Sequence, residues 1–209
     1  MPATTLAELK QQEKDARRNL ILEAARELFA TKDFRQVTVR EIARQAGVSV
    51  GTIYNYYENL DQLFLDIFLE CSQEITQLID RRAEESRPAL IDLCRIYVDY
   101  LNRNMTFYQM MSHFMLGNDL TPQATERLNT AMRQLMNRIE AGLGRAAAPP
   151  GKRLTAHALF AALNGVMISY ARYPGRTDAE IREHTLRLTD IIAGVFAEAQ
   201  GKASRKPKG

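Results

Sequence analysis

The sequence is poor in the side chains that build metal centres and disulfide frameworks. Among 209 residues it has two cysteines and three histidines. The histidines, His113, His157 and His184, are far apart and lack the short spacing of paired metal ligands. Neither cysteine has a histidine beside it in sequence, and no glycine-rich phosphate loop is present. We therefore expect no catalytic residues, no metal and no cofactor, although an enzyme stays an alternative because catalytic sites assemble in space.

Long apolar runs are also missing. No stretch reaches the length that spans a bilayer, and the N-terminus lacks the apolar core of a signal peptide, so we expect a cytoplasmic protein with no membrane partner. Cys71 and Cys94 occupy apolar positions within helical patterns. Two buried free thiols in a reducing compartment are expected, with a disulfide as the alternative.

The charge balance is only weakly basic. The formal net charge is +3, which permits nucleic-acid binding without arguing for it. Hydrophobic residues make up 45% of the chain, enough to bury a sizeable core. Apolar residues recur at helical spacing, and we find neither a strand pattern nor an internal repeat. The sequence predicts an all-α protein of about nine helices.

One stretch, residues 38–57, is typical of two short helices joined by a tight turn. It reads TVREIARQAGVSVGTIYNYY. Thr38 and Glu41 fit a capping box at the start of the first helix. Gly47 stands where a helix end needs a left-handed residue, and Ser49 can cap the second helix.

The second short helix has an apolar stripe and an outer polar face. Val50, Ile53 and Tyr57 share the stripe at i, i+3 and i+7. A helix-turn-helix places its second helix in a DNA major groove, where hydroxyls and amides bond to phosphates and base edges. The alternative is an ordinary helical hairpin with a solvated outer face. The residues left outside or on the flanks are Ser49, Gly51, Thr52, Tyr54, Asn55 and Tyr56.

A longer ordered string of residues surrounds this motif, in the first third of the chain. The string runs Ile21, Ala24, Ala25, Leu28 and Phe29, then Thr38 to Ala43, Ala46 to Ser49, Gly51 to Tyr54, and Leu63-Phe64. On these residues, positions 17–64 resemble the DNA-binding domain of the tetracycline-repressor (TetR) family of bacterial regulators. The resemblance implies that Thr38 and Arg40 meet phosphates. It also implies that Ser49, Gly51, Thr52, Tyr54, Asn55 and Tyr56 face the groove and its phosphate walls.

The sequence departs from the family pattern at two places. The family commonly has lysines just after the recognition helix, where this chain has Glu58 and Leu60. A carboxylate there repels phosphate, so Arg17, Arg18 or the N-terminal arm would supply the missing contact. Asp33 replaces a frequent glycine, which is tolerable because aspartate can adopt the left-handed conformation.

The predicted organisation has four parts. Residues 1–16 form a flexible polar arm, and residues 17–60 form the three-helix DNA-binding domain. Residues 61–200 form a larger helical domain for effector binding and dimerisation. Residues 201–209 form a disordered basic tail.

The segment 154–173 is apolar on nearly all sides and must be covered on all sides. Ala158, Ala161, Ala162 and Gly165 would let another helix approach closely. A central position in a monomer is one arrangement. We favour the other, a homodimer in which helices at about 154–173 and 178–200 form a four-helix interface with their copies. The resemblance implies the same arrangement, with the two-fold symmetry that a palindromic site needs.

Apart from Met1, every methionine lies between Met105 and Met167. Methionine side chains are flexible and polarisable, so this segment suits a cavity for a small hydrophobic or aromatic effector. The alternative is that these residues only fill the core. The candidate effector-binding residues are Phe107, Met110, Met111, Phe114, Met115, Met132, Met136, Met167 and Tyr170.

These patterns lead to one functional hypothesis. The chain is expected to be a ligand-responsive repressor that binds double-stranded DNA at a palindromic operator as a dimer. A small hydrophobic effector would release it. The alternative is a TetR-like regulator without a small-molecule ligand, one that senses a protein or acts as an activator.

Overall fold

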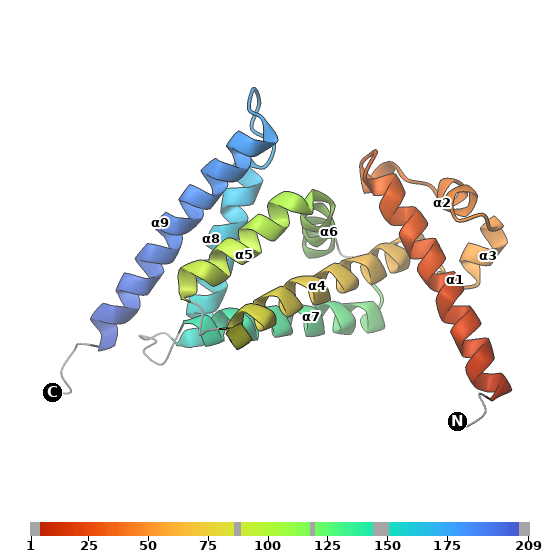
Figure 1. Ribbon diagram of the computed structural model, residues 1–209, viewed down its shortest axis with the longest axis horizontal. Helices are drawn as coiled ribbons and strands as arrows, with labels where there is room; N and C mark the ends of the chain where they lie inside the picture. The colour runs from red at the N-terminus through yellow and green to blue at the C-terminus, as the bar shows by residue number, and fades with distance from the viewer. Residues whose placement is uncertain (1–4, 86–88, 118–119, 144–150, 205–209) are drawn as a thin grey trace. The chain divides into compact units, whose positions relative to one another are not determined.

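The structure is a computed structural model that describes residues 5–85, 89–117, 120–143 and 151–204. Within these ranges all regular structure is helical, with nine α-helices and one short 3₁₀ helix (Figure 1). The predicted all-α class is confirmed. The chain divides into two compact units: Met1–Glu70 with Gln109–Ala124, and Cys71–Tyr108 with Thr125–Gly209. The division falls within one long helix, later than the boundary between residues 60 and 61 that the sequence predicts.

The first unit contains the predicted helix-turn-helix and its supporting helices. Phe29, Phe34 and Phe64 meet edge to face at its centre, with ring centroids 5.2–6.2 Å apart. Such pairs contribute about 0.5–1.5 kcal/mol beyond the area they bury. The elements are α1 (Leu6–Phe29), the 3₁₀ helix η1 (Phe34–Gln36), α2 (Val39–Gln45), α3 (Val50–Tyr54), the first part of α4 (Leu60–Glu85) and the end of α6 (Met105–Leu116).

Helix α1 begins earlier than the sequence interpretation expects. Residues 6–16, assigned to a flexible arm, form the first turns of α1, while residues 1–4 lie outside the described part. The reason is a capping box. Thr5 Oγ1 accepts from the Glu8 amide, and Glu8 Oε2 accepts from the Thr5 amide. Few apolar residues mark these turns, so the sequence shows no clear helical period there.

The expected left-handed conformation at Asp33 is wrong. Asp33 has φ −57° and ψ 130°, and no described residue other than glycine has a positive φ. Instead, its carboxylate accepts from the Arg35 amide at 3.0 Å and caps η1. Aspartate therefore replaces the glycine by starting a 3₁₀ turn, which needs a side-chain acceptor and no left-handed backbone.

The second unit contains the rest of the helices, packed around α5. Helix α5 buries one face fully, with Val98 and Leu101 at its centre, and packs against α8 and α9. Helices α8 and α9 also pack against each other (Figure 1). The elements are the rest of α4, α5 (Leu90–Arg103), the start of α6, α7 (Pro122–Gly142, from Thr125 on), α8 (Lys152–Tyr170) and α9 (Asp178–Ser204).

Buried polar groups fix the register of α5 on α9. Thr185 is fully buried, accepts from Asn102 Nδ2 at 2.9 Å, and donates to a backbone carbonyl of its own helix. Two ion pairs, Arg95–Asp190 and Arg182–Asp99, flank this contact. A slip of one residue would separate the buried Thr185 from the half-buried Asn102, so one alignment is favoured.

The ends of the last two helices differ slightly from the expected ranges. Helix α8 ends at Tyr170, before the predicted 173, and α9 continues beyond the predicted 200 to Ser204. Residues 201–204 of the tail, expected to be disordered, are therefore helical. Residues 205–209 lie outside the described part of the chain.

Candidate DNA-binding surface and effector site

Helix α2 begins with the capping box that the sequence predicts. Thr38 Oγ1 accepts from the Glu41 amide at 3.3 Å, and the Thr38 amide donates to Glu41 Oε2 at 2.9 Å. Lys32 Nζ lies 2.6 Å from Glu41 Oε1, and this contact together with the bonds from Thr38 lowers the pKa of Glu41 to about 2. The Thr38 hydroxyl donates to Glu41 Oε2, with the two oxygens 2.8 Å apart. The Arg40 side chain is exposed.

The turn between α2 and α3 depends on Gly47. Its φ of 67° is left-handed, and the Val48 amide donates to the Ala43 carbonyl at 2.9 Å across the turn. These are the features of a glycine helix C-cap. Ser49 then caps α3, because its hydroxyl accepts from the Thr52 amide at 3.0 Å. The end of α2 and the start of α3 are thus each determined by residues that are close in sequence.

Helix α3 has the two faces that the sequence predicts. Ile53 and Tyr57 are buried, with 1% and 4% of their surface exposed. On the other side Tyr54 is 54% exposed. The α-helical part ends at Tyr54, and Asn55 and Tyr56 continue as a turn. Of the predicted groove residues, Ser49, Gly51, Tyr54 and Asn55 are exposed, and Thr52 and Tyr56 are half-buried.

The unexpected glutamate after the recognition helix has a local role. Asn59 Oδ1 accepts from the Gln62 amide at 2.9 Å and so caps α4. Glu58 Oε2 accepts from Gln62 Nε2 at 3.0 Å, and the Glu58 amide donates to Gln62 Oε1 at 3.2 Å. Glu58 therefore stabilises the start of α4 at a position where the family commonly has a phosphate-binding lysine.

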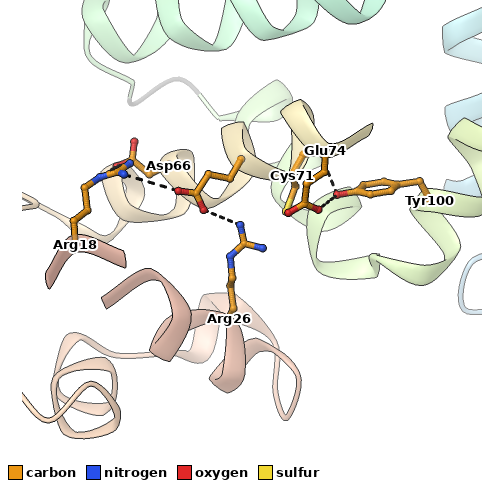
Figure 2. Close-up of polar contacts among 7 residues, drawn as sticks. Arg18, Arg26, Asp66, Cys71, Glu74 and Tyr100 are labelled. Atoms are coloured by element: carbon orange, nitrogen blue, oxygen red, sulfur yellow. Dashed lines mark hydrogen bonds and ion pairs between the residues drawn. The ribbon is translucent and has the colours of Figure 1, made fainter. Parts of the chain in front are cut away.

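Two arginines of α1 bind carboxylates of α4 (Figure 2). Arg18 donates through Nη2 to Asp66 Oδ2 at 2.7 Å and through Nε at 3.2 Å. Arg26 donates to Glu70 Oε2 at 2.8 Å. Asp66 is buried, so it needs this partner. Of the two arginines proposed for phosphate contact, Arg18 is thus held within the protein. Arg17 is exposed and pairs with a glutamate one turn earlier on α1.

The second half of α4 is held by a tyrosine of α5. The Tyr100 hydroxyl lies 3.1 Å from the Cys71 carbonyl and 2.9 Å from Glu74 Oε2 (Figure 2). Its ring meets Phe107 of α6 edge to face at 5.5 Å. Burial is the main reason that the pKa of Tyr100 is raised, so the hydroxyl keeps its proton and acts as a donor.

The predicted effector residues are mostly core residues and are divided between the two units. Met110, Met111, Phe114 and Met115 belong to the first unit, and the other five belong to the second. Six are buried, namely Phe107, Met110, Met111, Phe114, Met136 and Met167. Met132 and Tyr170 are half-buried, and Met115 is 49% exposed.

The second unit contains a small internal void that the sequence did not reveal. Its volume is about 10 Å³, about the space of one water molecule. Its apolar lining comes from Ile79, Leu93, Leu135, Ile139, Leu159 and Leu163. Cys94, Tyr97 and Arg138 complete it, and none of the nine predicted effector residues takes part. The only signal in the sequence was an arginine interrupting the apolar stripe of α7.

A larger hollow of about 470 Å³ lies on the surface where α8 passes into α9. The Tyr170 ring stacks on Tyr173 at 6.0 Å and meets His184 edge to face at 4.8 Å. Of the predicted effector residues, only Tyr170 lines it. Its charged groups already pair with one another, as Arg176–Glu180 and Arg187–Glu183.

Potential metal-ligating and thiol side chains occur among the described residues. No group of three or more histidine, cysteine, aspartate or glutamate side chains among them could hold a metal ion. Cys71 and Cys94 are free and buried, and burial raises the pKa of the Cys94 thiol to about 12, which favours the protonated thiol at neutral pH. No described helix is both long and apolar enough to cross a membrane.

Comparison with known proteins agrees with this architecture. Residues 21–67 match the family model described as bacterial regulatory proteins, tetR family. The transcriptional regulator YhgD of Bacillus subtilis is 25% identical over 187 residues, covering 87% of this chain and 97% of that protein. The transcriptional repressor KstR2 of Rhodococcus jostii is 30% identical over 139 residues, covering 62% of this chain and 67% of KstR2.

A solved structure shows the same fold over most of the chain. The TetR-family repressor FadR of Thermus thermophilus, in complex with lauroyl-CoA, superposes with a TM-score of 0.58 at 25% identity, covering 82% of this chain and 92% of FadR. The helix-turn-helix geometry, the family match and these relatives agree. This chain belongs to the TetR family of DNA-binding bacterial transcriptional regulators.

Proposed function

We propose that this protein is a ligand-responsive repressor that binds a palindromic operator as a homodimer. The observation that carries the proposal is the division of α3 into two faces. Ile53 is buried while Ser49, Gly51, Tyr54 and Asn55 are exposed, on a helix capped at its start. A short capped helix with an anchored core face and a polar outer face suits insertion into a major groove.

The phosphate contacts come from exposed cations. Arg40 at the start of α2 is exposed, whereas the Thr38 hydroxyl already donates to Glu41. The family resemblance implies that Thr38 contacts a phosphate. Because its hydroxyl proton is already used, Thr38 would make that contact through another atom. Arg18 would have to leave Asp66 to reach a phosphate. We therefore assign the role of the missing lysines to Arg17 and to the lysines of the first turns of α1.

The homodimer interface is the exposed apolar side of α8 and α9. Ile168 on α8 is 74% exposed, and Ile191 and Val195 on α9 are 64% and 62% exposed. Large aliphatic side chains gathered on adjacent helices favour burial against a second copy. Ala158 and Ala161 are exposed on α8 as well, so a partner helix can approach closely. Two-fold symmetry then presents two α3 helices to a palindrome.

Release by a hydrophobic effector completes the proposal. Repression requires the two α3 helices to lie about 34–36 Å apart, in successive major grooves. An effector that prefers another arrangement of α4 would disturb this spacing, with about 1–3 kcal/mol of coupling. Two relatives support the proposal: KstR2 is a repressor, and Thermus thermophilus FadR holds lauroyl-CoA in its crystals. Such a regulator works in the bacterial cytoplasm.

One observation favours the second candidate, a regulator without a small-molecule ligand. The internal void has a volume of only about 10 Å³, and the 470 Å³ hollow lies on the surface with its charged groups paired to one another. Ligand sites usually measure about 300–1,000 Å³. A protein-sensing regulator needs no such space. Whether the regulator represses or activates transcription depends on where the operator lies relative to the promoter.

Genomic footprinting followed by binding measurements tests the proposal. The purified protein is expected to select palindromic sites, and the logarithm of its affinity should fall steeply with the logarithm of salt concentration. Protein that selects no palindromic site would contradict the operator assignment. Weak binding to every DNA sequence would mean that the α2–α3 surface contacts DNA only non-specifically.

A further inference from the structure

The internal void of the second unit has one charged wall. Leu135, Arg138 and Ile139 contribute to it from α7, at the i, i+3 and i+4 spacing of one helical face. The other walls are mainly aliphatic, with the Cys94 thiol and the Tyr97 hydroxyl as polar groups. That hydroxyl is already used, because it donates to Asn164 Oδ1 at 3.1 Å. The interior thus suits an apolar chain, and Arg138 is the one lining residue that carries a charge.

The guanidinium of Arg138 makes three hydrogen bonds. Its Nε donates to Asp80 Oδ1 at 2.9 Å and its Nη2 donates to Asp80 Oδ2 at 2.5 Å. Its Nη1 donates to the Gln134 carbonyl at 3.0 Å. This is the bidentate geometry that arginine forms with any carboxylate or similar anion. The side chain of Asp80 is 48% exposed, so Asp80 can turn into water when another anion takes its place.

The same ion pair joins α7 to α4. Helices α5, α8 and α9 pack closely against one another, whereas α7 makes few close backbone contacts with them. Through Arg138, α7 is tied to Asp80, which lies near the end of α4. Because the void holds no more than a water molecule, a ligand must widen it. Moving α7 away from α4 is one displacement that would widen it.

We propose that this void is the effector site, that its ligand is an apolar chain with one anionic head group, and that the head group replaces Asp80 on Arg138. The inference rests on the proposed ligand-responsive function. It adds the charge of the ligand and names Arg138 as the residue that binds the charged head group. Exchange of partners frees α4 from α7 in the same step as binding. A ligand with a cationic or neutral head cannot make this exchange.

Three probes of equal chain length test the head group. Dodecanoate, dodecanol and dodecylamine are titrated into the full-length protein by calorimetry, with each ligand below its micellar concentration. We expect dodecanoate to bind about tenfold tighter than dodecanol, as a hydrogen-bonded charge suggests, and dodecylamine to bind most weakly. Arg138→Met should bring dodecanoate and dodecanol to the same affinity. Arg138→Lys should restore part of the difference.

Two further variants separate this inference from a general loss of stability. Asp80→Asn removes the competing carboxylate and should raise affinity for dodecanoate several-fold while leaving dodecanol unchanged. Arg133→Met is the matched control, because Arg133 is an exposed, ion-paired arginine of α7 that does not line the void. Its dodecanoate affinity should equal that of the unaltered protein. Thermal unfolding of every variant reports whether it is folded.

The outcomes distinguish the two levels of the proposal. Equal binding of dodecanoate and dodecanol, or a preference that survives in folded Arg138→Met, would overturn the head-group assignment and leave a ligand-responsive regulator. If none of the three probes binds, the effector assignment fails together with ligand responsiveness towards apolar chains. Operator binding, measured without any probe, then shows whether the DNA-binding proposal still holds.

Discussion

Individual side chains of α3 contribute either to the folded core or to the surface proposed to recognise DNA. Ile53 and Tyr54 are neighbours in sequence, yet one is 1% exposed and the other 54% exposed. A substitution at Ile53 removes core packing, and one at Tyr54 removes exposed surface that contacts DNA in the proposed complex. The exposed position is therefore the informative one for testing recognition.

Tyr54→Ala and Thr52→Ala should weaken operator binding without unfolding the protein. Removal of a good base or phosphate contact costs about 1–3 kcal/mol, so about tenfold weaker binding is expected for Tyr54→Ala. Thr52→Ala should have a smaller effect, because the hydroxyl of Thr52 also bonds to Ser49 at 2.8 Å. Fluorescence anisotropy with the footprinted operator measures both. Unchanged affinity in the two variants would mean that this face does not read DNA.

At the scale of whole elements, α1 has two roles along its length. Its C-terminal half is buried through Ile21 and Ala25 and is tied to α4 by arginine–carboxylate pairs. Its N-terminal turns, from Leu6 to Arg17, are exposed on every side and include Lys10 and Lys14. These lysines are one helical turn apart, so they lie on one face.

Lys10→Gln and Lys14→Gln test whether these turns bind phosphate. Each substitution should weaken binding to all sequences alike and reduce the salt slope by about 1 for each phosphate that the protein no longer neutralises. Gln12→Ala, an exposed neutral change between the two lysines, is the control and should leave the slope unchanged. Binding as a function of salt concentration measures the slope. If a variant with both substitutions had the same salt slope as the unaltered protein, the phosphate contacts would have to lie on other residues.

The sequence predicted the elements that obey local rules. The capping box at Thr38, the turn at Gly47 and the cap at Ser49 each depend on residues within a few positions, and the structure confirms all three. The box at Thr5 is equally local, but the polar surface of the following turns concealed the helix. Periodicity identified Ile53 and Tyr57 as core residues, although Val50 on the same stripe is half-buried, and it could not separate core from cavity lining. The methionine-rich segment is an example, because most of its residues are buried away from the void.

The pairs that shape the candidate sites could not be predicted, because they join distant residues. Arg18 meets Asp66 across 48 positions, and Arg138 meets Asp80 across 58. A single sequence shows only that each aspartate stands in a helix. The partner depends on how the helices pack, and packing is set by many side chains at once.

At the scale of the whole molecule, the proposed function requires a second copy of the chain. A single α3 recognises one half-site, and a palindrome offers two half-sites about one helical turn apart. Only an interface that fixes two chains in a two-fold arrangement converts two weak contacts into one strong one. The exposed aliphatic residues of α8 and α9 are placed on adjacent helices, as such an interface demands.

Ile168→Glu and Ile191→Glu should therefore break the homodimer. Burying an unpaired carboxylate in the interface is expected to cost about 2 kcal/mol or more, which corresponds to about thirtyfold weaker association. Analytical ultracentrifugation measures the association, and operator binding should fall with it while the thermal unfolding of the monomer persists. Leu116→Glu is the control, because Leu116 is a large aliphatic residue, 82% exposed, at the end of α6. Dimers that survive both isoleucine changes but dissociate in Leu116→Glu would move the interface from α8 and α9 to α6.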